Sequence, residues 1–403
     1  MKSDIVIIGA GAAGLSLATL LAENNINITI IEKSDLKNIK NPEYDGRETA
    51  LTHSSIKILK EINAWQNIEK ESISPILEAK VLNGYSKYSL DFDSKNTNQE
   101  ALGYLVANNV IRKALFKEVE KLKNIEIIDN ISVLDIKNKD QNSLVTLSNN
   151  KVIETKLLIA ADSRFSKIRN KMGISTDIHD FARAMIVCKM EHEQDHKNIA
   201  LECFYEDRVM AILPLKGKIS SIVTTLPINI AEEMTKIDEE AFNADINQYL
   251  EKILGKVKLT GKRYLYPLTS TYANKFIDKR FAVIGDAAVG MHPVTAHGFN
   301  LGLLGQKNLT DKINQAIKNN EDIGSDKLLQ KYQKQHIKDT KIMYHGTNIM
   351  VNIFTNNKIS AKILRSLMLR TANNRFLPFK SMIANRLSGE KPKIIKLFNK
   401  IFK

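Results

Sequence analysis

The residues with the clearest capacity for chemistry form a glycine-rich turn, Gly9-Ala10-Gly11-Ala12-Ala13-Gly14, with the spacing G-x-G-x-x-G. In such a turn the first glycine makes the bend, the second lets backbone approach a pyrophosphate, and the third packs helix against strand. Glu32, 18 positions beyond Gly14, can accept hydrogen bonds from ribose hydroxyls, and Lys33 beside it belongs to the same predicted site. An acid here disfavours a 2′-phosphate, so the pattern predicts binding of a dinucleotide other than NADP.

A second group of residues follows a buried strand late in the chain. The strand at 281–284 ends in Gly285-Asp286, and a loop containing Pro293 leads to a helix near Gly298-Phe299-Asn300. A carboxylate there can hold a polyol chain, and helix amides can face an anionic ring edge. Asp162, in the segment 160–166, supplies a third piece. Alone, the second group would suggest an ordinary strand–loop–helix connection, but the three groups together favour one cofactor site.

The elements that must position these residues follow from hydrophobic spacing. Residues 1–35 predict a strand, a turn, a helix and a strand, and further helices are expected over 47–65 and 109–122. Strand patterns occupy 125–147, 157–162, most of 182–226 and 281–285, and the pattern from 326 onward is helical. The predicted fold class is α/β (α+β): a Rossmann-like domain interrupted by an antiparallel sheet, with a helical C-terminal tail.

Three regions are predicted from this order. The Rossmann-like cofactor domain comprises 1–70, 100–178 and 270–325, the β-sheet substrate domain comprises 71–99 and 179–269, and a helical region comprises 326–403.

Composition narrows the function classes. The net charge of +14 over 403 residues resembles a nucleic-acid signal, but twelve Lys and Arg against one acid lie between 356 and 403. That segment carries +11 and leaves about +3 for the other 355 residues, so no nucleic-acid partner is expected. Cys188 and Cys203 lack metal-ligand spacing and are expected to be small buried hydrophobes, and no metal is predicted.

The chain shows neither a signal-peptide pattern nor an apolar run of the roughly 20 residues that span a bilayer, which predicts a cytoplasmic protein. In the segment 393–403, Ile394, Leu397, Phe398 and Ile401 share one helical face and lysines surround it. This is the pattern of an interfacial helix that binds a membrane surface peripherally. A helix that docks on the domain or on a partner protein is the alternative.

Taken together, the three cofactor segments resemble the glycine fingerprint, DG motif and GD motif of the class A flavin monooxygenases, over roughly residues 1–375. The segments 45–51 and 102–106, with Arg112, resemble the ubiquinone-biosynthesis hydroxylases within that class. Ser163, Val289 and Gly305 depart from the common pattern, as does the segment 296–298. With these residues, the chain resembles the branch of UbiM-type 5-demethoxyubiquinol hydroxylases.

The resemblance implies an FAD-dependent monooxygenase with the p-hydroxybenzoate-hydroxylase fold. NAD(P)H, or electrons from a partner, would reduce the flavin, O2 would form a flavin hydroperoxide, and the aromatic ring of a polyprenylated ubiquinone precursor would be hydroxylated. The substrate, a polyprenyl-phenol or demethoxyubiquinol-type molecule, would lie between the flavin and the 182–226 sheet. The protein would work on the inner face of a bacterial plasma membrane, with other ubiquinone-biosynthesis proteins as possible partners.

The resemblance also implies residue roles. Gly9, Gly11, Gly14 and Glu32 would hold the adenosine half, Arg47, Arg112 and Asp286 the pyrophosphate or ribityl part, and Asp162 would close the back of the site. The segment Gly298–Asn300 would face the flavin ring, and His297 is a hypothetical modest catalytic contributor. The full predicted cofactor set is Gly9, Gly11, Ala12, Ala13, Gly14, Glu32, Lys33, Arg47, Arg112, Asp162, Gly285, Asp286, Pro293, Gly298, Phe299 and Asn300.

Two other functions remain open. One is another flavoenzyme on this fold, such as a hydroxylase of soluble aromatics or a prenyl reductase. A halogenase is disfavoured because Trp65 is the single tryptophan and a Trp-x-Trp motif is absent. The other is a non-catalytic, FAD-stabilised subunit of a membrane-associated complex.

Overall fold

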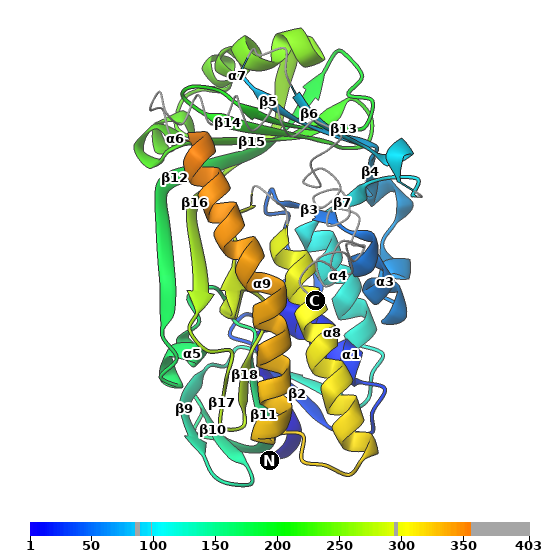
Figure 1. Cartoon of the computed structure of the whole chain (residues 1–403), viewed down its shortest axis with the longest axis vertical. Helices are drawn as coiled ribbons and strands as arrows, with labels where there is room; N and C mark the ends of the chain where they lie inside the picture. The colour runs from blue at the N-terminus through cyan, green and yellow to red at the C-terminus, as the bar shows by residue number, and fades with distance from the viewer. Residues whose placement is uncertain (85–88, 98, 294–296, 356–403) are drawn as a thin grey trace, which may run out of the picture.

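A parallel sheet at one end of the molecule carries the glycine turn (Figure 1). The computed structural model describes residues 1–84, 89–97, 99–293 and 297–355. The sheet has the strand order β17-β18-β11-β1-β2-β8, and β11, β1, β2 and β8 run parallel. Its strands are β1 (Lys2–Ile8), β2 (Ile28–Ile31), β8 (Ile125–Ile128), β11 (Val152–Ala160), β17 (Ile277–Asp278) and β18 (Phe281–Val283), with β9 (Val133–Asn138) and β10 (Ser143–Leu147) attached through β11.

Continuous apolar runs explain this sheet. All four residues of β2 and the last four of β1 are buried, as expected for parallel strands covered on both faces. Helices α1 (Ala12–Leu21), α4 (Asn108–Val119) and α8 (His297–Lys318) pack beside one another on it, and α9 (Asp326–Thr355) lies along α8 (Figure 1). One continuous hydrophobic core joins these helices to the strands.

The segment 47–65 corrects a prediction. Instead of one helix, it forms strand β3 (Glu48–Leu51), then helix α3 (His53–Glu61), and a short 3-10 turn begins at Trp65. Strand β3 pairs antiparallel with β7 (Gly103–Ala107), which also pairs with β4 (Ser74–Ile76). The Thr52 hydroxyl accepts from the amide of Ser55 at 3.3 Å and starts α3. The distant partner β7 therefore overrides the local helical spacing.

A second large sheet crosses the opposite end of the molecule (Figure 1). Its order is β19-β16-β12-β15-β14-β13-β5-β6, largely antiparallel, as the sequence predicts for 182–226. The strands are β5 (Glu78–Asn83), β6 (Ser89–Asp93), β12 (Thr176–His192), β13 (Ile199–Phe204), β14 (Val209–Pro214), β15 (Ile219–Pro227), β16 (Val257–Ala273) and β19 (Val289–Gly290).

Alternation along the strands divides this sheet into two faces. Helices α6 (Ile228–Met234) and α7 (Glu239–Leu254) cover the outer face, whose core includes both cysteines. Burial raises the pKa of the Cys188 and Cys203 thiols to about 12, so these thiols stay neutral and pack as hydrophobes, as predicted. The inner face points toward β3 and the parallel sheet.

Within the described part of the chain, no helix combines the length and apolarity needed to cross a bilayer. The predicted basic amphipathic helix at 393–403, and the predicted helical region beyond residue 355, lie outside the described residues. The division of the chain into the three predicted regions stays a prediction.

Candidate active site

The glycine turn between β1 and α1 has a different steric reason at each glycine. Gly9 has φ +109°, and a Cβ there would lie 2.6 Å from the carbonyl oxygen of Ala161. A Cβ on Gly14 would lie 1.9 Å from the carbonyl oxygen of Gly9, so this helix–strand crossing tolerates only glycine. A Cβ on Gly11 would meet nothing within 4 Å. The backbone at Gly11 therefore faces open space, where a phosphate can approach.

The start of α1 is prepared for an anion. Ala12 and Ala13 open the helix with no capping side chain and no acid in the first turn. The amides of a first helical turn have no partner within the helix, and the helix dipole favours negative charge beside them. This arrangement suits a pyrophosphate at the turn.

The carboxylate of Glu32 lies beside the same turn, at the end of β2. It accepts hydrogen bonds from the amide of Ala10 at 2.7 Å and from the amide of Ser34 at 2.9 Å. The two bonds fix the carboxylate where the ribose of a bound dinucleotide would lie. The neighbouring Lys33 is exposed, and its part in the site stays a prediction.

The Gly285-Asp286 turn packs directly on the start of α1. Gly285 has φ +56°, and a Cβ there would lie 2.8 Å from the Cβ of Ala13. Tertiary packing therefore joins two motifs that are about 270 residues apart in the chain. The exposed Asp286 accepts a hydrogen bond from Nη2 of Arg164 at 3.3 Å.

Arg164 and Arg169 hold this part of the site. The sequence predictions assign no role to either residue. Arg164 also donates from Nη1 to the carbonyl of Thr269 at 2.8 Å. Arg169 is buried and donates to the carbonyl of Ala287 at 2.7 Å, directly after Asp286. For Arg164, the sequence does hold a signal, because this residue lies two positions after the predicted site residue Asp162. For Arg169 the sequence holds no such signal, because its partner lies in a distant segment.

Asp162 follows strand β11 and lies beside the glycine turn. Its Oδ2 accepts from the amide of Lys167 at 3.1 Å, while Oδ1 is buried with no hydrogen-bond partner in the part of the chain that the structure describes. A buried carboxylate oxygen without a partner is costly. A bound hydroxyl or amide group would satisfy it.

Arg47 precedes β3 and pairs with Asp45. Oδ2 of Asp45 accepts from Nε of Arg47 at 3.0 Å and from Nδ2 of Asn108 at 2.8 Å. Burial favours the neutral carboxyl, but the hydrogen bonds and charge of Arg47 outweigh it and hold the pKa of Asp45 below its usual value. The guanidinium of Arg47 also lies 5.5 Å from the ring centre of Tyr266 on β16.

Arg112 lies on α4 and is half-buried. Burial lowers its pKa, the carboxylates of Asp45 and Glu32 raise it, and the charge of Arg47 lowers it. Arg112 thus lies close to two predicted site residues, Glu32 and Arg47. Among the described residues its guanidinium has no hydrogen bond or ion pair, so its charge is available to an anionic ligand.

The start of α8 meets β3 through Asn300. The buried Asn300 amide accepts from the amide of Thr52 at 3.0 Å and donates to the carbonyl of Ala50 at 2.8 Å. Phe299 packs against the main core. Among the described residues, a Cβ on Gly298 would have only the Met291 side chain within 4 Å. Pro293 is exposed, and residues 294–296 lie outside the described part. Contact of Gly298–Asn300 with a flavin stays a prediction.

His292 and His297 differ in their surroundings. His292 is buried, and burial, with the charges of Arg164 and His179, lowers its pKa to about 4. Its ring packs edge-on against Phe181, with 4.6 Å between ring centres. Because it is neutral at physiological pH, it is a poor proton donor. His297 is the first residue of α8 and half-buried, and its catalytic role stays a prediction.

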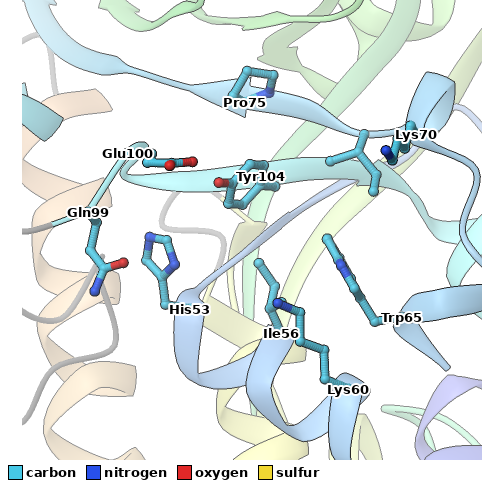
Figure 2. Close-up of a pocket in the computed structure, with 10 residues that line it drawn as sticks. His53, Ile56, Lys60, Trp65, Lys70, Pro75, Gln99, Glu100 and Tyr104 are labelled. Atoms are coloured by element: carbon cyan, nitrogen blue, oxygen red, sulfur yellow. The ribbon is translucent and has the colours of Figure 1, made fainter. Parts of the chain in front are cut away.

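A cavity of about 580 Å³ opens beside α3 (Figure 2). Tyr104 lies on its wall between His53 and Trp65, with ring centres 5.9 Å and 6.3 Å away, and Lys60 and Lys70 add positive charge. None of the predicted cofactor residues lines this cavity. Within the described residues, no three His, Cys, Asp or Glu side chains are grouped so that they could hold a metal.

We call the residues around the glycine turn (Gly11, Glu32, Arg112, Asp162 and Asp286) the cradle, and their chemistry fits FAD. Open backbone at Gly11 suits a phosphate. The Oδ1 of Asp162 and the guanidinium of Arg112, both without a partner among the described residues, suit a hydroxyl or amide donor and an anionic group. Glu32 and Asp286 lie at positions suited to the ribose and the polyol chain. The fold and this cradle define a protein that binds FAD.

Comparison with known proteins also indicates an FAD-binding protein. Residues 2–340 match the model of the FAD binding domain family. The ubiquinone hydroxylase UbiM of Neisseria meningitidis is 42% identical over 96% of this chain and 85% of its own length. The ubiquinone hydroxylase UbiL of Rhodospirillum rubrum is 30% identical, over 96% of this chain and 90% of its own length. The chain belongs to the FAD binding domain family and, within it, to the family of FAD-dependent ubiquinone hydroxylases.

Solved structures show the same fold at low sequence identity. The p-nitrophenol 4-monooxygenase PnpA from Pseudomonas putida has a TM-score of 0.77 and 15% identity, covering 97% of this chain and all of its own. The FAD-dependent monooxygenase pqsL from Pseudomonas aeruginosa also has a TM-score of 0.77 at 15% identity, over 91% of this chain and all of its own.

Proposed function

We propose that this enzyme hydroxylates the aromatic ring of a polyprenylated ubiquinone precursor. The observation that carries the proposal is the 42% identity to a ubiquinone hydroxylase over nearly the whole chain. The 3-demethoxyubiquinol 3-hydroxylase of Escherichia coli, 26% identical over 92% of this chain and 94% of its own length, supports the same substrate class. The ring carbon or carbons oxidised are left open.

FAD, when bound, supplies the activation of O2, with NAD(P)H or a partner protein as the source of electrons. The chain's own residues bind and orient it. The amides at Gly11, Ala12 and Ala13, with Arg112, hold the pyrophosphate, and Arg47 holds the nearby ribityl part. A second set, Glu32, Asp162 and Asp286, accepts hydrogen bonds from hydroxyl groups.

The inner face of the second sheet offers the substrate an apolar surface. Val81, Ala211 and Val223 on this face are half-buried and keep accessible apolar surface. A polyprenyl chain gains about 25 cal/mol for each Å² of apolar surface that it removes from water. Such a surface supports a lipid-like tail better than it supports a small, soluble aromatic.

The basic tail supports a peripheral location on the inner face of a bacterial plasma membrane. Its segment 393–403 carries lysines around an apolar stripe, and each lysine near an anionic surface contributes about 1 kcal/mol. Deletion of 391–403 should reduce co-sedimentation with anionic liposomes. Unchanged co-sedimentation would favour docking of the tail on the domain or on another ubiquinone-biosynthesis protein.

A non-catalytic, FAD-stabilised subunit is the alternative that sequence similarity does not exclude. The test of the main proposal is complementation of bacteria that lack their ubiquinone ring hydroxylases, one deletion at a time, followed by mass spectrometry of extracted quinones. Restored ubiquinone identifies the pathway, and the rescued strain identifies the carbon. Absence of rescue by soluble, FAD-loaded protein would contradict the quinone substrate and favour another aromatic substrate or the non-catalytic alternative.

A further inference from the structure

An acidic side chain, Glu202 of β13, lies on the inner face of the second sheet. Strand pairing sets Glu202 of β13 between Val81 of β5 and Ala211 of β14. The same row continues through Val223 and Val187 on the next two strands. Because neighbouring residues of a strand point to opposite faces, Cys203 lies in the outer core and Glu202 points inward.

The inner face around Glu202 is not closely packed. Ala200, Glu202, Ala211 and Val223 are all half-buried. On the outer face, by contrast, Cys203, Ile212 and Ile222 are fully buried. Small side chains that keep accessible surface on an inward face indicate space for a ligand between the sheet and the cofactor domain.

This face adjoins the segment that carries predicted cofactor contacts. Ala50 of β3 packs against the same hydrophobic cluster as Phe204 and Val209 of the inner face. Its carbonyl is bound by Asn300 at the start of α8. A molecule in the space below Glu202 would therefore lie between the sheet and the predicted flavin-ring segment.

The carboxyl of Glu202 lies in apolar surroundings. Among the described residues it forms no hydrogen bond or ion pair, and burial raises its pKa to about 8. Its strand neighbours Val81 and Ala211 are apolar. A cation on the same face, Lys189 of β12, pairs with Glu48 at 3.6 Å. An unpaired carboxyl in such surroundings is destabilising unless a ligand satisfies it.

We propose that Glu202 accepts a hydrogen bond from the ring hydroxyl of the phenolic substrate and takes up that proton as the ring is oxidised. This inference rests on the proposed function. In the step, the phenol O–H bond breaks, a carboxylic O–H bond forms on Glu202, and the electron pair stays on the phenol oxygen. A carboxylate that titrates near neutral pH is a better base for a phenol than one that titrates near pH 4.5.

The test compares FAD-loaded wild-type protein with Glu202→Gln and with a control variant, Glu206→Gln, which removes an exposed acid in the turn after β13. The probes are a water-soluble 2-prenylphenol with a short side chain and its O-methyl ether. Binding is followed by the change in flavin absorbance, and hydroxylation by mass spectrometry of the product.

Loss of a hydrogen bond to a carboxylate should weaken phenol binding by about tenfold or more in Glu202→Gln and leave Glu206→Gln unchanged. Wild-type protein should prefer the phenol to the ether, and Glu202→Gln should lose that preference. Equal preference in both would overturn the role of Glu202. If wild-type protein neither binds nor hydroxylates the prenylphenol, the proposed function fails instead, which separates the two ideas.

Discussion

At the scale of single residues, the site is defined by polar groups that the chain leaves without partners. Oδ1 of Asp162 is buried and unsatisfied, and Arg112 and Glu202 lack partners among the described residues. Two buried arginines elsewhere are paired instead: Arg280 binds Asp322 at 2.5 Å, and Arg208 binds Asp207 at 2.8 Å. Unpaired charges cost stability, so their position around one region points to the ligands that bind there.

Replacement of Arg112 by alanine should weaken FAD binding by about ten- to a hundredfold, because a charge-assisted contact to phosphate is lost. Lys113→Ala, one position along α4 and exposed, is the matched control. The measurement is the FAD dissociation constant from fluorescence titration of the apoprotein. Equal constants for both variants would show that Arg112 does not contact the cofactor.

Glu202 should also give stability a pH dependence. Its pKa is about 8 in the folded protein and near 4.5 in the unfolded chain, so the folded state holds the proton more tightly. Its contribution to stability is therefore complete below pH 4.5 and is lost as pH rises to about 8. Thermal melting should show wild-type protein losing stability relative to Glu202→Gln between pH 5 and 8.5. Parallel curves would mean that the carboxyl is ionised throughout.

At the scale of elements, a glycine lets two long helices approach closely. Gly305 of α8 faces the ring of His336 on α9, and a Cβ at Gly305 would lie 2.4 Å from Cε1 of that ring. The His336 ring is buried, stacked on Tyr332 and packed against Phe276. These neighbouring rings hold it in place, which gives a steric reason for glycine at position 305.

Gly305→Ala should therefore destabilise the protein. Overpacking costs about 1–3 kcal/mol, which outweighs the gain of about 1 kcal/mol from replacing a helical glycine. The control is Gly346→Ala on α9, where a Cβ would meet nothing within 4 Å and the same replacement should be neutral or stabilising. Chemical denaturation measures both. A stabilised Gly305→Ala protein would show that α8 and α9 can shift apart at little cost.

At the scale of the whole molecule, the cradle is assembled from four distant parts of the chain. The glycine turn, Arg112 on α4, Asp162 after β11 and Asp286 after β18 converge because β1, β11 and β18 are neighbours in one sheet. A ligand that contacts all four parts stabilises the folded state only, so binding raises the free energy of unfolding.

FAD added to the apoprotein at about 1,000 times its dissociation constant should stabilise it by about 4 kcal/mol. FMN, which lacks the adenosine half, should stabilise far less, because the Gly9–Gly14 turn and Glu32 would have no ligand. Differential scanning calorimetry compares the two flavins. An equal effect of FMN would place the binding energy on the isoalloxazine and ribityl part alone.

The sequence by itself determined the local parts of this protein. Residue type and spacing within short segments predict two of them: the order strand–turn–helix–strand that ends at Glu32, and the turn at Gly285. The antiparallel strands of the second sheet likewise show in their alternation. Such features depend on neighbours a few residues away, which the sequence displays directly.

Only the tertiary structure decided the features that depend on distant partners. Residues 48–51 have a helical apolar spacing but form a strand, because β7 pairs with them across more than 50 residues. The Asn300 amide bonds to Ala50 and Thr52, the His336 ring covers Gly305, and Glu202 faces inward without a partner. Each of these results from packing between segments far apart in the chain, and no local pattern of residues encodes it.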